Sequence, residues 1–343
     1  MKHTSLPASS QARAGDPVTA TAWVETPLQL LSVLEAHHAG RFARHTRVLP
    51  RSGAGALVDT VAALTDAGLP DGLAVLPPAP APARHQNDSG VWFIGDAFSG
   101  QVQRTLVGDR NRDYVIVDDG LATLHLLRLL SRRRAAPLER ARVRSSPLRR
   151  ALGLASAVKL RAAARAGRVT VFTVLPLPEP LVHDAAAAGI RVVTHDFPWL
   201  RSLPGGSAPA EDRVVLGSAM VRDGLVHAEP YLAWVTEQAR NGAVLYHPHR
   251  REDARTLEPL NAAPGVRVAP RGLPAELALR GLRARHRVVS LPSTAVTSLR
   301  VLLERHGTTV EAVPVPEPWW TDRAAPELRA HLSTFVADQK GTS

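Results

Sequence analysis

Two adjacent carboxylates, Asp118 and Asp119, stand between the short apolar run 114–117 and Gly120. A polar run precedes the apolar one, and leucines at helical spacing follow Gly120. This order is typical of a strand, a turn and a helix in a parallel sheet. Ligands of such sheets bind at the carboxyl ends of the strands. The pair is therefore a candidate catalytic site, although a helix cap at Asp119 and a plain turn at Gly120 would give the same pattern.

Two further candidate centres follow short apolar strands in the second half of the chain. His247 and Pro248 form one, and Ser293 and Thr294 form the other. A carboxylate can take a proton from a hydroxyl. An imidazole, hydroxyls and the backbone N–H groups at the start of a helix can hold a phosphate and stabilise its departure. If two sheets face each other, these three strand ends line one cleft in a layout suited to glycosyl transfer.

The elements that would position these residues alternate along the chain. Apolar and amphipathic runs predict an α/β protein with doubly wound parallel sheets. Strands are expected at 19–24, 46–49, 90–94, 114–117, 169–174, 191–194, 213–216, 243–246, 266–268, 287–291 and 309–313. A helix is expected at 274–282.

The stretch 197–210 is rich in Pro, Gly and Ser and predicts a domain boundary. We expect a disordered N-terminus at 1–17, an acceptor-side N-terminal domain at 18–204 and a donor-binding C-terminal domain at 205–343.

Composition excludes several classes of protein. The 343 residues include no cysteine, which excludes disulfides, thiolate catalysis and Cys-based zinc sites. No apolar run approaches the roughly 18–20 residues that span a bilayer. The first 17 residues are polar and lack the apolar centre of a secretory signal. The expectation is a cytoplasmic protein, either soluble or peripheral on the inner face of the plasma membrane.

The positive charge is concentrated in one segment. The formal net charge is +11, and residues 131–168 contain twelve Lys or Arg against one acid, Glu139. We expect this segment to be helical. Such a patch favours an acidic membrane surface or an anionic glycan. Nucleic acid is not expected as a partner, because the segment has no aromatic residue for stacking. The alternatives are a solvated surface without any partner and a non-catalytic binder of anionic lipid or nucleic acid.

The three motifs together resemble a known family. Bacterial sialyltransferases and polysialyltransferases of the GT-B type carry an acidic-acidic-Gly, a His-Pro and a Ser-Ser/Thr motif in that order. This chain has Asp118-Asp119-Gly120, His247-Pro248 and Ser293-Thr294 in the same order and at comparable separations. The turn Val215-Leu216-Gly217-Ser218 is similar to the opening of the donor domain in this group. The resemblance implies a GT-B fold, with two Rossmann-like domains facing each other across a cleft, over residues 19–335.

The resemblance also implies an activity: inverting transfer of sialic acid, or a related nonulosonic acid, from a CMP-activated donor to a glycan hydroxyl. One of Asp118 and Asp119 would be the general base, with Asp119 favoured because it lies nearer the cleft opening. His247 and Pro248 would contact the donor phosphate. No metal and no cofactor besides the CMP-sugar co-substrate are implied.

The donor-binding residues implied by the resemblance have alternatives. Ser293 and Thr294 would hold the phosphate or the sugar carboxylate, and the turn of Gly217 and Ser218 would touch the nucleotide. His249 could replace His247 as the phosphate contact, and Ser293 could simply cap a helix. A transferase for cell-wall polymers that uses another nucleotide-activated donor is the main rival reading.

Two further questions are whether the arginines after Pro248 bind phosphate and whether the two aspartates bind a metal ion. Arg250 and Arg251 could bind phosphate or only cover surface. A divalent metal at Asp118 and Asp119 is disfavoured, because no third carboxylate follows closely.

Overall fold

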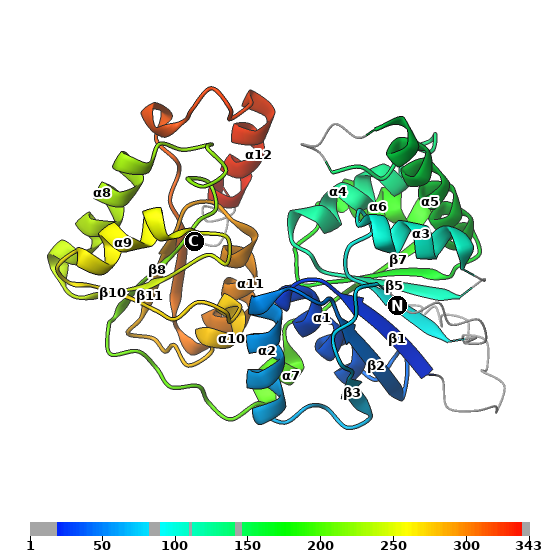
Figure 1. Cartoon of the computed structure of the whole chain (residues 1–343), viewed down its shortest axis with the longest axis horizontal. Coiled ribbons are helices and arrows are strands. Elements are labelled where there is room, and N and C mark those ends of the chain that lie inside the picture. The colour runs from blue at the N-terminus through cyan, green and yellow to red at the C-terminus, as the bar shows by residue number, and fades with distance from the viewer. Residues whose placement is uncertain (1–18, 82–89, 110–111, 141–145, 338–343) are drawn as a thin grey trace, which may run out of the picture.

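The computed structural model describes residues 19–81, 90–109, 112–140 and 146–337. The predicted disordered segment 1–17 lies outside these residues. Within them the chain forms two parallel sheets (Figure 1).

The first sheet has seven strands in the order β3-β2-β1-β4-β5-β6-β7. They are β1 (Thr19–Val24), β2 (His45–Pro50), β3 (Leu73–Val75), β4 (Val91–Ile94), β5 (Asp113–Val117), β6 (Val169–Thr173) and β7 (Ile190–Thr194). All of its strand pairs are parallel. The strand order reverses between β1 and β4, which are neighbours although β2 and β3 separate them in sequence. Such a reversal opens a crevice at the carboxyl ends of the two strands.

The second sheet has five parallel strands in the order β10-β9-β8-β11-β12. They are β8 (Arg213–Leu216), β9 (Val244–His247), β10 (Val266–Val268), β11 (Arg287–Ser290) and β12 (Thr309–Ala312). Its order reverses between β8 and β11. We call the first sheet with its helices the N-terminal lobe and the second the C-terminal lobe.

Helices fill the crossovers of both sheets. In the N-terminal lobe they are α1 (Pro27–His38), α2 (Gly55–Asp66), α3 (Gly100–Gly108), α4 (Leu121–Leu130), α5 (Pro147–Arg165), α6 (Glu179–Ala187) and α7 (Pro198–Ser202). In the C-terminal lobe they are α8 (Ala228–Gln238), α9 (Ala254–Ala262), α10 (Ala275–Ala278), α11 (Thr294–Leu303) and α12 (Pro326–Ala337), with 3₁₀ turns η1 (Ala239–Asn241), η2 (Glu304–His306) and η3 (Glu317–Trp319). No helix of the described residues is long and apolar enough to cross a membrane.

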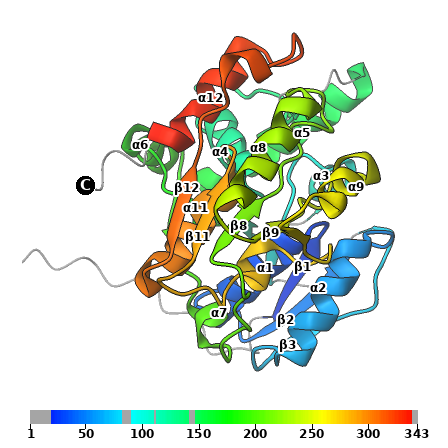
Figure 2. The ribbon, with the colours of Figure 1, turned by 90° about the vertical axis from the view of Figure 1, so that its left-hand side faces the viewer.

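The two lobes meet through α1 and α2 on one side and α10 and α11 on the other (Figures 1 and 2). The hydroxyl of Thr60 donates to the carbonyl of Gly272 at 3.3 Å. One apolar cluster includes Leu30 and Phe93 of the N-terminal lobe together with Val288 and Leu299 of the C-terminal lobe. The lobes therefore share a continuous core beneath the region where their strand ends face each other.

Local sequence explains how the site-forming helices begin. Thr26 caps α1, with its hydroxyl accepting from the Gln29 N–H at 3.3 Å, and Pro27 occupies the first turn. Strand β5 is exposed only at its first residue and is otherwise buried. It ends in the turn that contains the two aspartates and Gly120, and α4 starts immediately afterwards.

The prediction that the whole basic segment is helical is wrong for residues 131–140. That stretch is irregular, and only α5 is helical; residues 141–145 lie outside the described part of the chain. The backbone of Leu138 instead packs on Gly153 of α5, where its N–H donates to the Gly153 carbonyl at 3.2 Å. A Cβ at Gly153 would lie 3.0 Å from the Leu138 carbonyl oxygen, so the contact needs glycine.

The helix expected at 274–282 is also too long, since α10 is a single turn.

Candidate functional site

A pocket of about 200 Å³ lies between the two lobes. The N-terminal lobe lines it with Thr26, Asp119 and Gly120, and the C-terminal lobe with Gly217, His247 and Thr294. Thr26 follows β1 and Asp119 follows β5. Gly217 and Thr294 follow β8 and β11, the pair at which the strand order of the second sheet reverses. Each predicted motif therefore contributes at least one residue to the same pocket.

Asp119 reaches the pocket, and its carboxylate is partly exposed there. Its backbone N–H donates to Thr123 Oγ1 at 3.0 Å, and Thr26 Oγ1 donates to its Oδ1 at 3.4 Å. Burial, and to a smaller extent the negative charge of Asp96, raises the pKa of Asp119 to about 7. Arg250 across the pocket opposes this shift. The carboxylate is thus poised to gain or lose a proton near neutral pH.

Asp118 points elsewhere. It is 1% exposed, does not line the pocket, and accepts hydrogen bonds from Thr173 Oγ1 and the Val174 N–H, both at 2.6 Å. Burial raises the pKa of Asp118 to about 6, and these hydrogen bonds oppose the shift. The side chain ties the end of β5 to the end of β6. Of the two candidate bases, only Asp119 is in a position to meet a substrate in the pocket.

Gly120 allows the two lobes to approach closely at the pocket. Its φ is +65°, a left-handed conformation that favours glycine. A Cβ there would lie 2.9 Å from Thr294 Oγ1 of the opposite lobe. The glycine of the acidic motif therefore serves both the turn and the contact with the Ser-Thr motif.

His247 is 7% exposed and lines the pocket next to Pro248. Burial lowers the pKa of His247 to about 4, and a hydrogen bond with the backbone of Leu273 opposes the shift. The imidazole is therefore neutral at pH 7 in this structure.

His249 and Arg250 line the pocket after His247 and Pro248. Burial lowers the pKa of His249 to about 4, and the charges of Arg251 and Arg250 lower it as well. Its Nδ1 accepts from the Arg251 N–H at 3.1 Å. Arg251 does not line the pocket and pairs with Asp223 at 2.7 Å. Of the two arginines considered from the sequence, only Arg250 lines the pocket.

The turn after β8 depends on Gly217. A Cβ there would lie 2.2 Å from Glu252 Oε2 and 2.6 Å from the His249 N–H. Glu252 Oε2 also accepts from that N–H at 2.6 Å, and Tyr246 donates to Oε1 at 2.5 Å. Ser218 is 6% exposed, and its hydroxyl accepts from the Met220 N–H. Ser218 does not line the pocket, so its predicted donor contact finds no support in the geometry.

The start of α11 faces the pocket through Thr294 and Ala295. Ser293 is the N-cap residue, but its hydroxyl makes no capping hydrogen bond and does not line the pocket. Ser293 therefore occupies the capping position that one alternative predicted, without the side-chain hydrogen bond of a cap. The positive end of the helix dipole at this terminus favours an anion such as phosphate.

Glu276 is a pocket residue that the sequence did not indicate. It lies on α10, is 4% exposed, and accepts a hydrogen bond from the Ser298 hydroxyl. Burial raises the pKa of Glu276. No sequence signal distinguished it, because Ala275-Glu276-Leu277 reads as an ordinary helical turn. No group of three or more Asp, Glu or His residues that could hold a metal occurs in the part of the chain that the structure describes.

No family model matches the chain, and no curated protein matches its sequence. Solved structures match along nearly its whole length. The alpha/beta-galactoside alpha-2,3-sialyltransferase of the luminous marine bacterium Photobacterium phosphoreum aligns with a TM-score of 0.54 at 10% identity, covering 93% of this chain and 96% of that one.

Two further solved structures align more loosely. A UDP-glucosyltransferase from Polygonum tinctorium gives a TM-score of 0.47 at 11% identity, over 96% of this chain and 95% of that one. The UDP-N-acetylglucosamine 2-epimerase of Rickettsia bellii gives 0.46 at 10% identity, over 95% and 90%. The two facing Rossmann-like sheets and the alignment with the sialyltransferase structure show that this chain has the GT-B fold.

Proposed function

We propose that the chain is an inverting, metal-independent glycosyltransferase. It moves sialic acid, or a related nonulosonic acid, from a CMP-activated donor to a glycan hydroxyl in the synthesis of a cell-surface polysaccharide or glycolipid. One observation carries the proposal: Asp119 of one lobe shares a pocket with His247 and Thr294 of the other. The order of the three motifs supports the choice of donor, and the GT-B fold is compatible with it.

In the proposed reaction the acceptor hydroxyl gives its proton to Asp119 while its oxygen attacks the anomeric carbon. The bond between that carbon and the phosphate oxygen breaks on the opposite face, so the configuration inverts and CMP leaves with the electron pair. A pKa of about 7 suits a general base that works at neutral pH. Asp118 would position this base by anchoring the β5 end rather than act on the substrate.

The departing phosphate would be held from the C-terminal lobe. Arg250 supplies a positive charge, and the N–H groups at the start of α11 supply hydrogen-bond donors and the positive end of the helix dipole. His247 would contribute a hydrogen bond once it carries a second proton. Pro248 and Gly217 shape the wall against which the nucleotide packs.

The test measures release of CMP from CMP-sialic acid by the purified chain, with and without EDTA. Asp119→Asn should lower kcat by about 10²–10⁴-fold, because it removes the base. Asp118→Asn is the matched control, because it removes a neighbouring carboxylate that lies outside the pocket. It should lower the melting temperature and leave most of the turnover. UDP-glucose and UDP-N-acetylglucosamine serve as rival donors.

Turnover that survives Asp119→Asn, or that EDTA abolishes, would contradict the mechanism. Turnover with a UDP-sugar and none with CMP-sialic acid would support the proposed transferase activity and contradict the proposed CMP-activated donor.

A further inference from the structure

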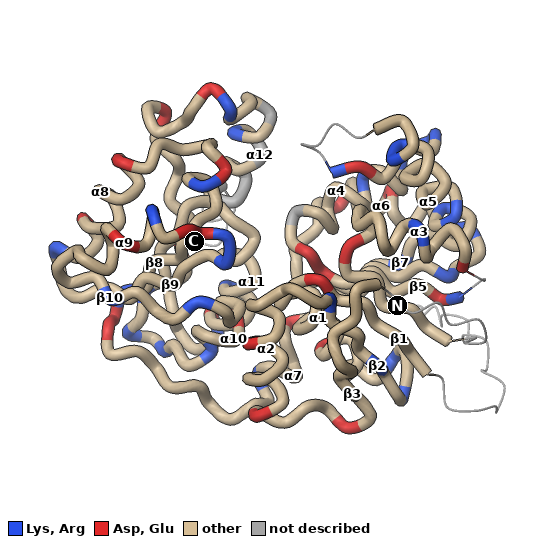
Figure 3. The backbone as a smooth tube through the Cα atoms, in the orientation of Figure 1, with Lys and Arg blue, Asp and Glu red and all other residues tan. Residues whose placement is uncertain are grey.

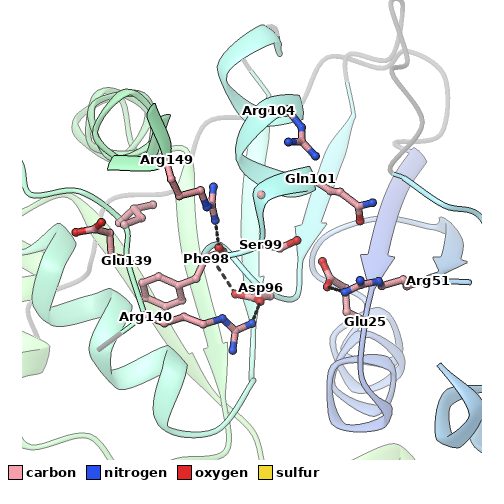
Figure 4. Close-up of a pocket in the computed structure, with 12 residues that line it drawn as sticks. Glu25, Arg51, Asp96, Phe98, Ser99, Gln101, Arg104, Glu139, Arg140 and Arg149 are labelled. Atoms are coloured by element: carbon pink, nitrogen blue, oxygen red, sulfur yellow. Dashed lines mark hydrogen bonds and ion pairs between the residues drawn. The ribbon is translucent and has the colours of Figure 1, made fainter. Parts of the chain in front are cut away.

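A second cavity, of about 430 Å³, opens in the N-terminal lobe (Figure 4). Glu25, which follows β1, and Asp96, which follows β4, line it together with the first residues of α3. These are the two strands between which the order of the first sheet reverses. In open α/β sheets such a reversal is the place where ligands bind. The cavity therefore occupies a ligand position that the interlobe pocket does not use.

This cavity lies beside Asp119. Glu25 directly precedes Thr26, whose hydroxyl donates to the Asp119 carboxylate at 3.4 Å. Asp96 and Arg140, which line the cavity, both act on the charge of Asp119: the carboxylate raises its pKa and the guanidinium lowers it. Consecutive residues, Glu25 and Thr26, thus line the cavity and the interlobe pocket, and the cavity adjoins the pocket on the side of the N-terminal lobe, whereas His247 and Thr294 line the pocket from the C-terminal lobe. In a displacement reaction that side belongs to the acceptor.

The cavity offers groups that suit sugar hydroxyls. The carboxylate of Asp96 is 2% exposed and pairs with Arg140, and that of Glu25 is 8% exposed and pairs with Arg51 at 2.7 Å. Each carboxylate has lone pairs left for hydroxyl donors. The side chain of Gln101 also faces the cavity (Figure 4). Because both carboxylates are balanced by an arginine, these pairs add no net charge.

Two arginines in the cavity are not balanced in this way. Arg104 and Arg149 form no ion pair with a carboxylate of the described residues. Arg149 donates to neutral partners, Gln103 Oε1 at 2.6 Å and the carbonyl of Phe98 (Figure 4). Its guanidinium carbon would lie 3.5 Å from a Cβ at Gly100, the first residue of α3. Arg149 therefore lies at the positive, N-terminal end of the nine-residue helix α3, and Arg104 lies at the middle of the same helix.

We infer that this cavity binds the acceptor, and that the acceptor is an acidic glycan whose carboxylate or phosphate is held by Arg104, Arg149 and the start of α3. The inference rests on the proposed transferase function, since the acceptor role follows from the position beside the base. The carboxylates of Glu25 and Asp96 then orient the sugar so that one hydroxyl meets Asp119.

Calorimetric titration without any donor tests the binding directly. Three probes share the lactose unit: lactose itself is neutral, 3′-sialyllactose adds a sugar that bears a carboxylate, and lactose 1-phosphate adds a phosphate. At least one acidic probe should bind about tenfold more tightly than lactose, and the preference should shrink as salt rises from 0.05 to 0.5 M. The two acidic arms separate a carboxylate-bearing acceptor from a phosphate-bearing one.

Arg149→Gln and Arg104→Gln should each weaken the acidic probe about tenfold and leave lactose unaffected. Arg165→Gln is the control, because it makes the same charge change on an exposed position of α5 outside the cavity. Arg104 is exposed, so its variant folds without difficulty even if Arg149→Gln does not. Equal binding of lactose and both acidic probes, or no binding of any of them, overturns the inference. So does undiminished acidic binding in both variants.

The donor-free titration separates this inference from the proposed function. The chain could bind acidic probes through Arg149 and yet release no CMP from CMP-sialic acid. That result would support the anion-binding cavity and contradict the proposed donor. CMP release with lactose as the preferred acceptor would support the proposed donor and contradict the acidic acceptor.

Discussion

Asp118 and Asp119 are neighbours in sequence but have opposite roles in the structure. Side chains alternate at a strand end, so one carboxylate turns under β6 and the other turns into the interlobe pocket. Both pKa values are raised mainly by burial. Only Asp119 combines a raised pKa with access to a ligand, and this is the combination that a general base requires.

The pH dependence of turnover should report this base. Asp119 is active as the carboxylate, and its folded pKa lies near 7. We expect kcat/KM to rise about tenfold per pH unit below pH 7 and to level off above it. Asp96→Asn removes the negative charge that raises this pKa, so the midpoint should move to lower pH. A pH profile measured on both proteins checks this; a midpoint near 4 in the wild type would contradict it.

Linkage gives an independent check on the same residue. The carboxyl of Asp119 has a higher pKa in the folded chain than the ordinary value of about 4 in the unfolded chain. The folded state therefore binds more protons between pH 4 and 7, and this contribution to stability falls as pH rises through that window. Asp119→Asn carries no proton, so relative to wild type it should be more stable at pH 8 than at pH 4.5. Urea unfolding at the two pH values measures the difference, and an equal effect at both would count against a raised pKa.

His247 should take up a proton when the donor binds. Burial keeps the ring neutral, so it can offer a charge-assisted hydrogen bond to a phosphate only after it gains a proton. A phosphate beside the ring raises the low pKa of about 4 through its negative charge. Calorimetric titration of CMP in buffers of different ionisation enthalpy should show proton uptake at pH 6. His247→Gln should abolish that uptake; unchanged uptake in this variant would assign the proton to another group.

At the scale of elements, the turn after β8 offers a sharp test of packing. A Cβ at Gly217 would collide with Glu252 Oε2 and with the backbone of His249. Gly217→Ala must therefore displace the turn, and we expect a loss of about 1–3 kcal/mol in stability together with weaker CMP binding. Gly108→Ala is the matched control, since nothing lies within 4 Å of that Cβ and the site ends a helix. Equal melting temperatures for the two variants would show that the turn can move to accommodate the Cβ without loss of stability.

The sequence predicted the strands well, because each is a short apolar run with polar or Gly and Pro residues on both sides. All eleven expected strands are present, with ends shifted by one residue at most. Helices were less predictable. The helix α9 was missed because it is short and contains Pro259, and α7 lies in a Pro-rich stretch where the carboxylate of Glu35 accepts from the N–H groups of Trp199 and Leu200. That contact joins residues more than 160 positions apart, which no local pattern encodes.

The candidate site was also predictable only in part. Residues at strand ends, such as Asp119 and His247, could be found because parallel strands align their carboxyl ends. Glu276 and the second cavity could not. They depend on long-range pairs such as Asp96 with Arg140, and on how the two lobes approach.

At the scale of the whole molecule, part of the excess positive charge is used within the protein. Basic residues gather along α5 (Figure 3). Lys159 donates to the carbonyl of Asp109 at 2.9 Å, and Arg161 donates to the carbonyls of Leu130 and Arg133. These contacts hold α5 against the ends of α3 and α4. Fewer cations are therefore free for a membrane surface than the charge count indicates.

The shared core makes a prediction about how the molecule unfolds. Two-domain chains of this length commonly unfold in steps. Here one apolar cluster contains residues of both sheets, and Arg201 of α7 donates to the carbonyl of Val301 in α11. Separating the lobes would expose that cluster to water at roughly 25 cal/mol per Å². We therefore expect one cooperative transition, with the calorimetric and van't Hoff enthalpies equal.

Leu299→Ala, in the shared cluster, should lower the melting temperature of the entire transition, because its loss weakens both lobes at once. Leu260→Ala, in the separate cluster of the C-terminal lobe, is the matched control and should do the same only if the two lobes are coupled. Differential scanning calorimetry of the three proteins decides. Two resolved peaks in the wild type, or a shift of one peak alone in Leu260→Ala, would show that the lobes unfold independently and that their contact does not fix the geometry of the pocket.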